Sequence, residues 1–318
     1  MPDLRPSSPK LQQIREGLLH WYRDMQRDLP WRRTRDPYAI LVSEVMLQQT
    51  QVDRVLPYYA RFLERFPTAH ALAEAPVAEV IKLWSGLGYN RRAVNLQRAA
   101  QVVVADHGGE FPADPDALRK LPGLGPYTAG AVAAFAFERD VVFLDTNMRR
   151  VITRLVFGAD SVPEREVLAA AEELLPPGHG WEWNQALIEF GALQCTARKP
   201  ACIVCPLSSQ CAAFPTIQGA LAESRTRRRP AERFETSSRY YRGRIVERLR
   251  ELPAEDAQGI PLASLGPHLR EDFSEADLPW LASLVQGLQR DGLAALAEER
   301  PDYDAALELT LDSRIRLP

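Results

Sequence analysis

Four cysteines fall within seventeen residues, with the spacing C-x6-C-x2-C-x5-C. No histidine lies near them, and four thiolates in so short a segment suit a tetrahedral sulfur site. A zinc ion and a 4Fe–4S cluster both fit that ligand set, and the spacing alone leaves them comparable. Two disulfides are the alternative, which a reducing compartment disfavours. The cysteines are Cys195, Cys202, Cys205 and Cys211.

Carboxylates in apolar surroundings are the second chemical feature. Glu44 is the one acidic residue in the almost wholly apolar segment 38–49. Burial should raise its pKa, although a core glutamate paired with an arginine would serve structure alone. Asp145 ends an apolar run, and either it or Asn147 could simply cap the helix that follows. Glu189 also stands among apolar neighbours.

Two Gly-x-Gly turns could bring the backbone close to another molecule. Gly123 and Gly125 stand between a predicted short helix at 115–121 and an alanine-rich helix at 127–137. This is a helix–hairpin–helix pattern, in which the N–H groups that open the second helix can hold a phosphate. An ordinary helical hairpin with a glycine turn is the alternative. The second turn, Gly86–Gly88, precedes Tyr89 and two arginines.

The elements that position these groups are helical nearly throughout. Apolar spacing predicts an all-α chain, with a small C-terminal domain of three helices and a terminal strand pair that resembles a winged helix. The expected helices span 9–28, 38–49, 51–66, one or two within 71–84, 91–107, 115–121, 127–137, 148–156, 163–175, 181–193, 239–252, 262–269 and 281–291. The expected strands span 293–297 and 307–311.

Composition bounds the class of protein. The chain has 318 residues, a net charge of −3 and 46% hydrophobic residues, enough for a full core and two or three domains. No segment is apolar enough to span a membrane, and the N-terminus lacks a signal peptide, so we expect a cytoplasmic protein. No heptad repeat appears, so we expect a monomer.

Together these motifs resemble the helix–hairpin–helix DNA glycosylases of the endonuclease III superfamily. The resemblance covers residues 9 to about 215, and the cysteine spacing is that of the family's 4Fe–4S loop. It implies a two-lobed fold, double-stranded DNA as partner, and phosphate contacts at Gly123, Gly125, Tyr127 and Thr128. The implied domains are a six-helix barrel at 30–137 with the hairpin at about 114–134, a cluster domain at 1–29 and 138–220, a basic linker at 221–235, and the C-terminal domain at 236–318.

Within the superfamily, the segment Ser43–Thr50 resembles the MutY-type adenine DNA glycosylases. So do Trp31 and Arg32, and Glu189 in its helix. The resemblance implies that Arg32 and Glu189 contact the adenine, and that Gln49, Thr50 and Leu87 surround the opposing purine. Trp31 and Tyr89 are further candidate substrate-binding residues. Bifunctional members carry a nucleophilic lysine where this chain has Tyr127, so Schiff-base lyase chemistry is not expected.

The implied mechanism uses two carboxylates, as in glycosidases. Neutral Glu44 would protonate N7 of a flipped adenine, and ionised Asp145 would stabilise or trap the oxocarbenium ion. Tyr127 and Asn147 would hydrogen-bond the carboxylates and the water.

Three departures bear on the opposing base. Thr146 stands where the MutY group usually has glycine, and Asn90 stands where a second tyrosine usually wedges into the duplex. No Nudix-like pattern follows residue 230, as in some compact bacterial relatives of this type. These departures leave open whether 8-oxoguanine or guanine is preferred opposite the adenine.

Three alternatives remain. A thymine or uracil mismatch glycosylase of the same fold also uses a tyrosine at 127 and an aspartate at 145, but tends to lack Glu189 and the Gln48–Thr50 run. A catalytically silent DNA-binding protein would not need both Glu44 and Asp145. A zinc-bound helical interaction module would explain only the cysteines.

Overall fold

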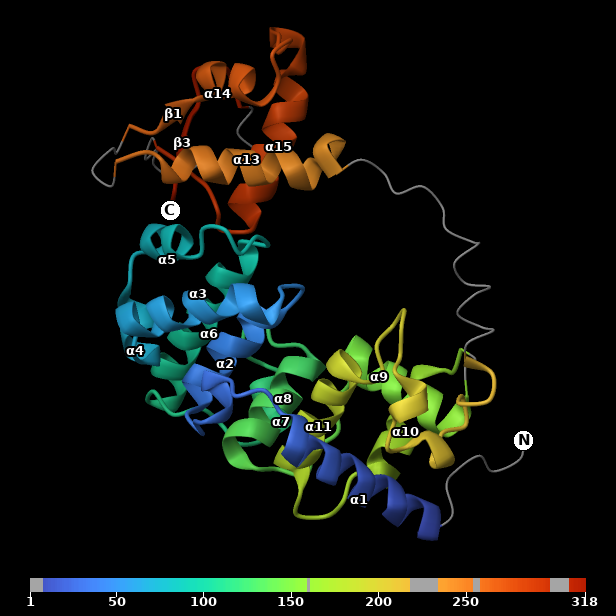
Figure 1. Cartoon of the computed structure of the whole chain (residues 1–318). Helices are drawn as coiled ribbons and strands as arrows, with labels where there is room; N and C mark the ends of the chain where they lie inside the picture. The colour runs from blue at the N-terminus through green and yellow to red at the C-terminus, as the bar shows by residue number, and fades with distance from the viewer. Residues whose placement is uncertain (1–7, 159–160, 218–233, 254–257, 298–308) are drawn as a thin grey trace. The chain divides into compact units, whose positions relative to one another are not determined.

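The computed structural model describes residues 8–158, 161–217, 234–253, 258–297 and 309–318 (Figure 1). Contacts divide the chain into two compact units, each built from separate segments. The first contains residues 1–44, 111–120 and 124–229, and the second contains 45–110, 121–123 and 230–318. The basic linker predicted at 221–235 lies mostly outside the described residues, and the predicted domain boundaries stay a prediction.

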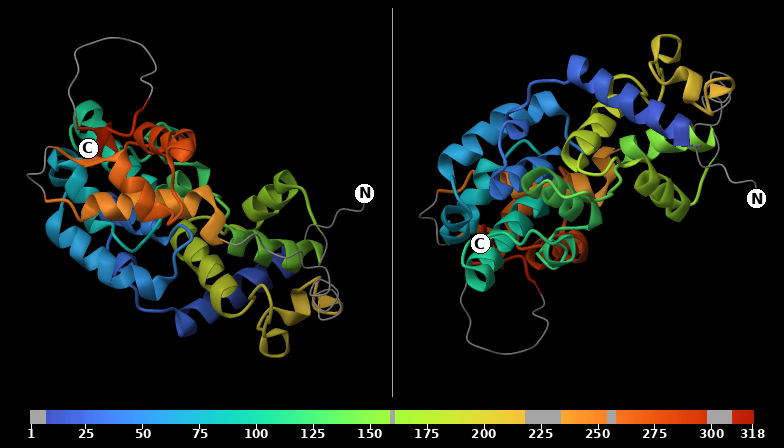
Figure 2. Two further views of the ribbon diagram at one scale, coloured as in Figure 1. Left: turned by 90° about the horizontal axis from the view of Figure 1, so that it is seen from above. Right: turned by 90° about the horizontal axis from the view of Figure 1, so that it is seen from below.

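The first unit is helical and encloses most of the candidate catalytic residues. Its helix α1 packs against α11, and α9 packs against both α10 and α11 (Figures 1 and 2). The helices are α1 (Ser8–Met25), η1 (Pro30–Arg32), α2 (Pro37–Leu47, continuing into the second unit), α7 (Pro115–Leu118), α8 (Pro126–Phe137), α9 (Thr146–Ile152), η2 (Thr153–Phe157), α10 (Glu164–Leu174), α11 (Gly180–Leu193), η3 (Cys202–Val204) and η4 (Ser208–Gln210).

Helix α8 lies in the core of this unit because its side chains are small. Every residue from Thr128 to Phe135 is buried. A Cβ on Gly130 would lie 2.7 Å from that of Phe143, so glycine allows the segment that leads to Asp145 to approach the helix closely. The packing therefore sets the position of Asp145 relative to α8.

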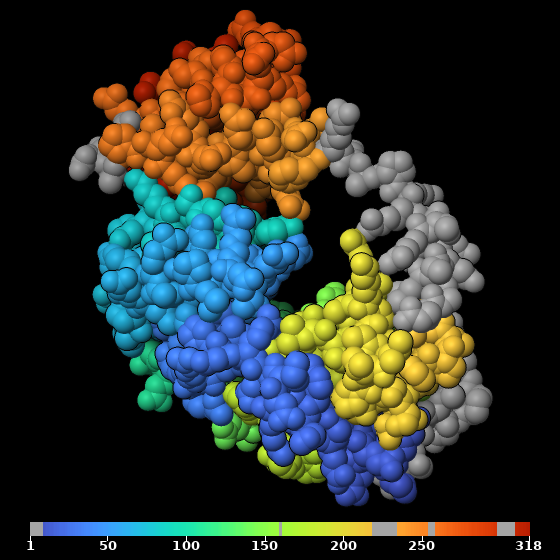
Figure 3. Space-filling view, viewed as in Figure 1, coloured from blue at the N-terminus to red at the C-terminus, as the bar shows by residue number. Residues whose placement is uncertain are grey.

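The second unit joins α5 and α6 to the C-terminal segment through one hydrophobic core. Ile81 and Val94 pack there with buried leucines, isoleucines and valines of α13, α14 and α15. The orange surface of the C-terminal segment accordingly lies against the cyan surface of α5 (Figure 3). The elements are α3 (Val52–Arg65), α4 (Ala69–Glu74), α5 (Val77–Leu83), α6 (Arg91–His107), η5 (Phe234–Thr236), α13 (Ser238–Arg250), β1 (Ile260–Pro261), α14 (Leu262–Leu269), η6 (Glu275–Asp277), α15 (Leu278–Arg290), β2 (Ala295–Leu296) and β3 (Arg314–Arg316).

The small sheet differs from the predicted strand pair. Its order is β1-β3-β2, with both pairs antiparallel and the buried Ile315 facing Ile260 on one side and Leu296 on the other. Strand β2 lies within the predicted 293–297, but 309–311 is not a strand, and 307–308 lies outside the described residues. For 309–311 the prediction is wrong, because these residues lead into a turn closed by a hydrogen bond from the Ser313 amide to the Thr310 carbonyl. The winged-helix assignment stays a prediction.

The predicted helices are found with ends displaced by a few residues. The helix predicted at 148–156 differs in the type of helix, because it begins as the α-helix α9 and continues as the π-helix η2. No helix among the described residues is both long and apolar enough to cross a membrane.

Candidate active site and cysteine loop

The first unit brings Glu44 and Tyr127 together. Glu44 on α2 is 5% exposed, and the hydroxyl of Tyr127 on α8 donates a hydrogen bond to its carboxyl group. Burial raises the pKa of Glu44 to about 7; the tyrosine bond opposes this, and the nearby charge of Asp145 adds to it. Burial also raises the pKa of Tyr127 well above its usual value. At neutral pH a substantial fraction of Glu44 is therefore protonated, as a general acid requires.

Asp145 is held in a fixed position beside this pair by two hydrogen bonds. Its Oδ1 accepts a hydrogen bond from the Met148 amide at 2.6 Å, and its Oδ2 accepts one from Nδ2 of Asn147 at 3.1 Å. Burial raises the pKa of Asp145, while these hydrogen bonds lower it. Asp145 thus caps α9, which is the purely structural role that the sequence also allowed. It also lies close enough for its charge to act on Glu44. The cap fixes the carboxylate, and Arg150 fixes Asn147 through a 2.8 Å bond to its Oδ1.

Glu189 forms the centre of a separate cluster, which is held together by ion pairs with two arginines. Its side chain is completely buried, and it accepts bonds of 2.8–2.9 Å from the amide, Nε and Nη2 of Arg27 and from Nη2 of Arg32. Burial alone would raise the pKa of Glu189, but these bonds outweigh it and hold the pKa at about 2. Arg32 also donates to Gln185 at 2.9 Å. Trp31, on the same turn as Arg32, is buried.

Arg27 was not among the residues predicted from the sequence. It follows the end of α1, and its partner lies 162 residues away. No local pattern marks such a residue, although an arginine beside a turn that carries a predicted ligand-binding arginine is a weak signal.

The residues predicted to surround the opposing purine lie in the second unit, together with the substrate-binding candidate Tyr89. Gln49, Thr50, Leu87 and Tyr89 line one groove with a volume of 1160 Å³. Gln49 and Tyr89 have left-handed φ angles of 54° and 46°, which are strained for residues with side chains. Tyr89 is 39% exposed, whereas Leu87 is buried. Strained, exposed side chains at a groove are typical of a binding site.

The hairpin glycines face solvent at the start of α8. Gly123 has a φ of +79°, and a Cβ at this position would collide with Asn95. The fold of the protein itself therefore requires glycine here. A Cβ on Gly125 would meet nothing within 4 Å, so the protein's own packing does not explain this glycine. Close approach of another molecule would explain it. The Thr128 side chain is buried, so a phosphate could meet only its backbone.

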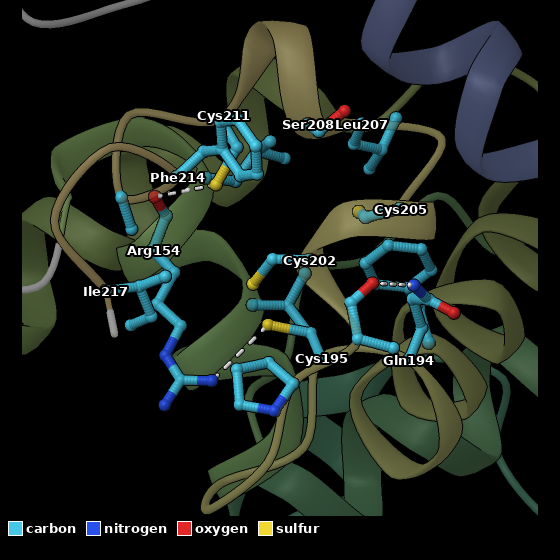
Figure 4. A pocket seen from close by; sticks show the side chains of 16 residues that line it. Arg154, Gln194, Cys195, Cys202, Cys205, Leu207, Ser208, Cys211, Phe214 and Ile217 are labelled. Atoms are coloured by element: carbon cyan, nitrogen blue, oxygen red, sulfur yellow. Dashed lines mark hydrogen bonds between the residues drawn. The ribbon is translucent and has the colours of Figure 1, made fainter. Parts of the chain in front are cut away.

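The four cysteines converge on one cavity, as Figure 4 shows. Apolar side chains such as Leu155 and Phe190 share its wall, and Nη1 of Arg154 lies 3.6 Å from Sγ of Cys195. Burial raises the pKa of Cys205 to about 11, so a bound cation would be needed to hold this side chain as a thiolate. Four thiols around one cavity are a ligand set that could hold a metal cluster.

Two family models match the chain. Residues 42–177 match the HhH-GPD superfamily of base excision DNA repair proteins, a span that includes Glu44, the hairpin and Asp145. Residues 195–211 match the iron-sulfur binding domain of endonuclease III. This span begins at Cys195 and ends at Cys211, the first and last of the four cysteines.

Curated relatives are similar over most of the chain. An adenine DNA glycosylase of Mycolicibacterium smegmatis is 41% identical over 291 residues, covering 89% of this chain and 95% of that protein. One of Mycobacterium tuberculosis is 39% identical and covers 95% of this chain and 92% of that protein. The human adenine DNA glycosylase is 42% identical over 218 residues, which cover 64% of this chain and only 40% of the human protein.

Solved structures share the fold of about two thirds of the chain. A thermostable thymine-DNA glycosylase is 33% identical with a TM-score of 0.62, covering 65% of this chain and 97% of that one. A non-covalent endonuclease III–DNA complex is 28% identical with a TM-score of 0.56, covering 69% of this chain and 99% of that one.

Proposed function

The chain belongs to the adenine DNA glycosylases of the HhH-GPD superfamily, and from that premise we propose that it removes adenine mispaired with 8-oxoguanine or guanine by hydrolysis alone. The observation that carries this proposal is Glu44, buried, with a pKa of about 7, and in contact with Tyr127. We also propose that the protein acts as a monomer, bound to duplex DNA in the cytoplasm.

The proposed reaction begins with a proton held by Glu44. Its carboxyl group donates that proton to N7 of the flipped adenine, which then leaves as a neutral base carrying the electrons of the C1′–N9 bond. Asp145 faces the oxocarbenium ion that remains and stabilises it as an anion. Water adds to C1′, and a proton from that water restores Glu44. The products are free adenine and an abasic site.

Adenine recognition falls to Arg32 and Glu189 in this proposal. The structure adds a constraint, because the four lone-pair positions of the Glu189 carboxylate already accept four N–H groups. A direct contact with the exocyclic amine of adenine would replace one arginine N–H. We propose that a bond from the half-buried Arg27 is the one exchanged, because Arg32 is more deeply buried.

A panel of duplexes tests the function. We expect alkali to break strands that carry A·8-oxoguanine and A·G after incubation with the protein, and to leave T·G and U·G duplexes whole. Without alkali no strand should break, because Tyr127 has no amine to form a Schiff base. Breakage confined to T·G and U·G would overturn the adenine assignment, and breakage without alkali would overturn hydrolysis alone.

The four cysteines hold a 4Fe–4S cluster, and we propose that the cluster orders the loop 195–211. We expect Cys205→Ser to lose iron and the brown colour of the protein, and to weaken duplex binding, because one ligand of four is replaced by a poor one. Iron and sulfide content, visible absorbance and DNA affinity measure this. Ser208→Ala, a change in the same loop that removes no sulfur, is the control and should keep all three.

A further inference from the structure

The groove of the second unit is strongly cationic. Its lining includes five arginines and a single carboxylate, that of Asp291. The C-terminal segment supplies part of this lining, since Arg239 and Arg242 stand on α13. Such a groove suits a nucleic acid backbone. The arginines are Arg54, Arg91, Arg92, Arg239 and Arg242.

Four of these arginines already have partners in the protein. Arg92 donates through Nη1 to the carbonyls of residues 45, 46 and 48 at 2.7–3.0 Å, so it holds the end of α2. Arg54 donates to the Gly86 carbonyl. Arg91 and Arg242 both pair with Asp291, the former at 3.3 Å. The hydrogen bonds and ion pairs of these four guanidiniums therefore hold the walls of the groove together.

Arg239 differs from them. Its guanidinium lies 4.4 Å from the ring centre of Tyr89 and 5.1 Å from that of Phe234. Ring contacts fix its plane and leave its N–H edge for another partner. Within the described ranges, no carboxylate or carbonyl accepts a hydrogen bond from this exposed side chain. Among the described residues it is thus a cation held by two rings, without a hydrogen-bond acceptor, beside the strained Tyr89.

A second contact ties α13 to the same loop. Nη2 of Arg250 donates to Oδ1 of Asn90 at 2.8 Å, and its Nε donates to the Ile81 carbonyl at 3.0 Å. Asn90, which departs from the tyrosine usual at this place, is therefore an anchor for the C-terminal segment. The anchor fixes Arg239 relative to the loop that carries Leu87 and Tyr89.

We propose that Arg239 binds a phosphate of the DNA strand that carries the purine opposite the excised adenine. This inference rests on the proposed function in one respect, the placing of that purine against Gln49, Thr50 and Leu87. The C-terminal segment then contributes directly to DNA binding, and its α13 forms one wall of the groove for the undamaged strand.

The test is the salt dependence of duplex binding. The probe is a duplex in which the adenine opposite 8-oxoguanine is replaced by 2′-fluoro-2′-deoxyadenosine, which resists cleavage because fluorine destabilises the oxocarbenium ion. We expect Arg239→Ala to weaken binding and to reduce the slope of log K against log salt by about 0.9, the contribution of one phosphate contact. Arg239→Lys should restore most of the slope.

The control is Arg244→Ala on the same helix, because Arg244 bonds Tyr240 and the His268 carbonyl and does not line the groove. It should leave the slope unchanged. An unchanged slope in Arg239→Ala would overturn the proposal, and so would a loss confined to 8-oxoguanine, which would mark a base contact. If the excised base proved to be thymine, the slope measured on a duplex with the matching uncleavable nucleotide would still test Arg239, so the two proposals fail separately.

Discussion

Glu44→Gln should reduce single-turnover adenine excision by about 10²- to 10⁴-fold while leaving duplex affinity nearly unchanged. Glutamine fills the same buried space and can still accept the hydrogen bond from Tyr127. It has no acidic proton for N7 of adenine, so only the chemical step is lost. The measurement is the rate of alkali-labile product formed with enzyme in excess, together with the dissociation constant of an uncleavable duplex.

Glu138→Gln is a suitable control, because Glu138 stands exposed at the end of the helix that carries Tyr127. It should excise adenine at the wild-type rate. If Glu44→Gln kept most of its rate, the proton would have to come from another group, and the assignment of the general acid would be wrong.

The same carboxyl group sets the expected pH profile. Because burial raises the pKa of Glu44 to about 7, its acid form dominates below pH 7 and becomes scarce above it. The single-turnover rate of the wild type should therefore be level on the acid side and fall about tenfold per pH unit on the alkaline side. Glu44→Gln should lose this dependence. A wild-type rate that rises through pH 7 would show that the ionised form is the active one.

The sequence predicts those parts of the site that depend on local pattern. Helix α6 begins at Arg91 and ends at His107 as expected, because Gly108 takes a left-handed φ and stops it. Glu44 is found buried because its helix has no other charge among its apolar residues. The cysteines gather because their spacing is itself the motif.

Features that depend on contacts between residues far apart in the sequence could not be predicted from the sequence. Arg27 meets Glu189 across 162 residues, and Arg250 meets Asn90 across 160. Strand β3 pairs with β1 across more than fifty residues, and its three residues carry two arginines, which weakens the apolar alternation that marks a strand. In each case tertiary contacts determine the pairing, and the local sequence pattern does not identify the partner.

Glu189→Gln should lower stability by about 3 kcal/mol or more, the second large effect we expect. The substitution keeps the size of the side chain but removes the one carboxylate that hydrogen-bonds Arg32 among the described residues. The side chain of Arg32 is only 7% exposed. A buried guanidinium then stands without a counter-charge, and an amide N–H faces its N–H groups. Thermal and urea unfolding with the cluster intact measure the change. Glu182→Gln on the same helix removes the exposed pair with Arg23 and should change the melting temperature little.

A double-mutant cycle separates charge from shape. If the unpaired guanidinium is the cause, adding Arg32→Gln to Glu189→Gln should cost less than Arg32→Gln costs alone, because the second change removes the orphaned charge. Strictly additive losses would contradict an ionic role and point to packing. Arg32 is also the proposed adenine contact, so the double variant should lose less stability than the two single changes added together, and it should still fail to excise adenine. That divergence would show that one buried cluster both holds α11 against the chain after α1 and recognises the base.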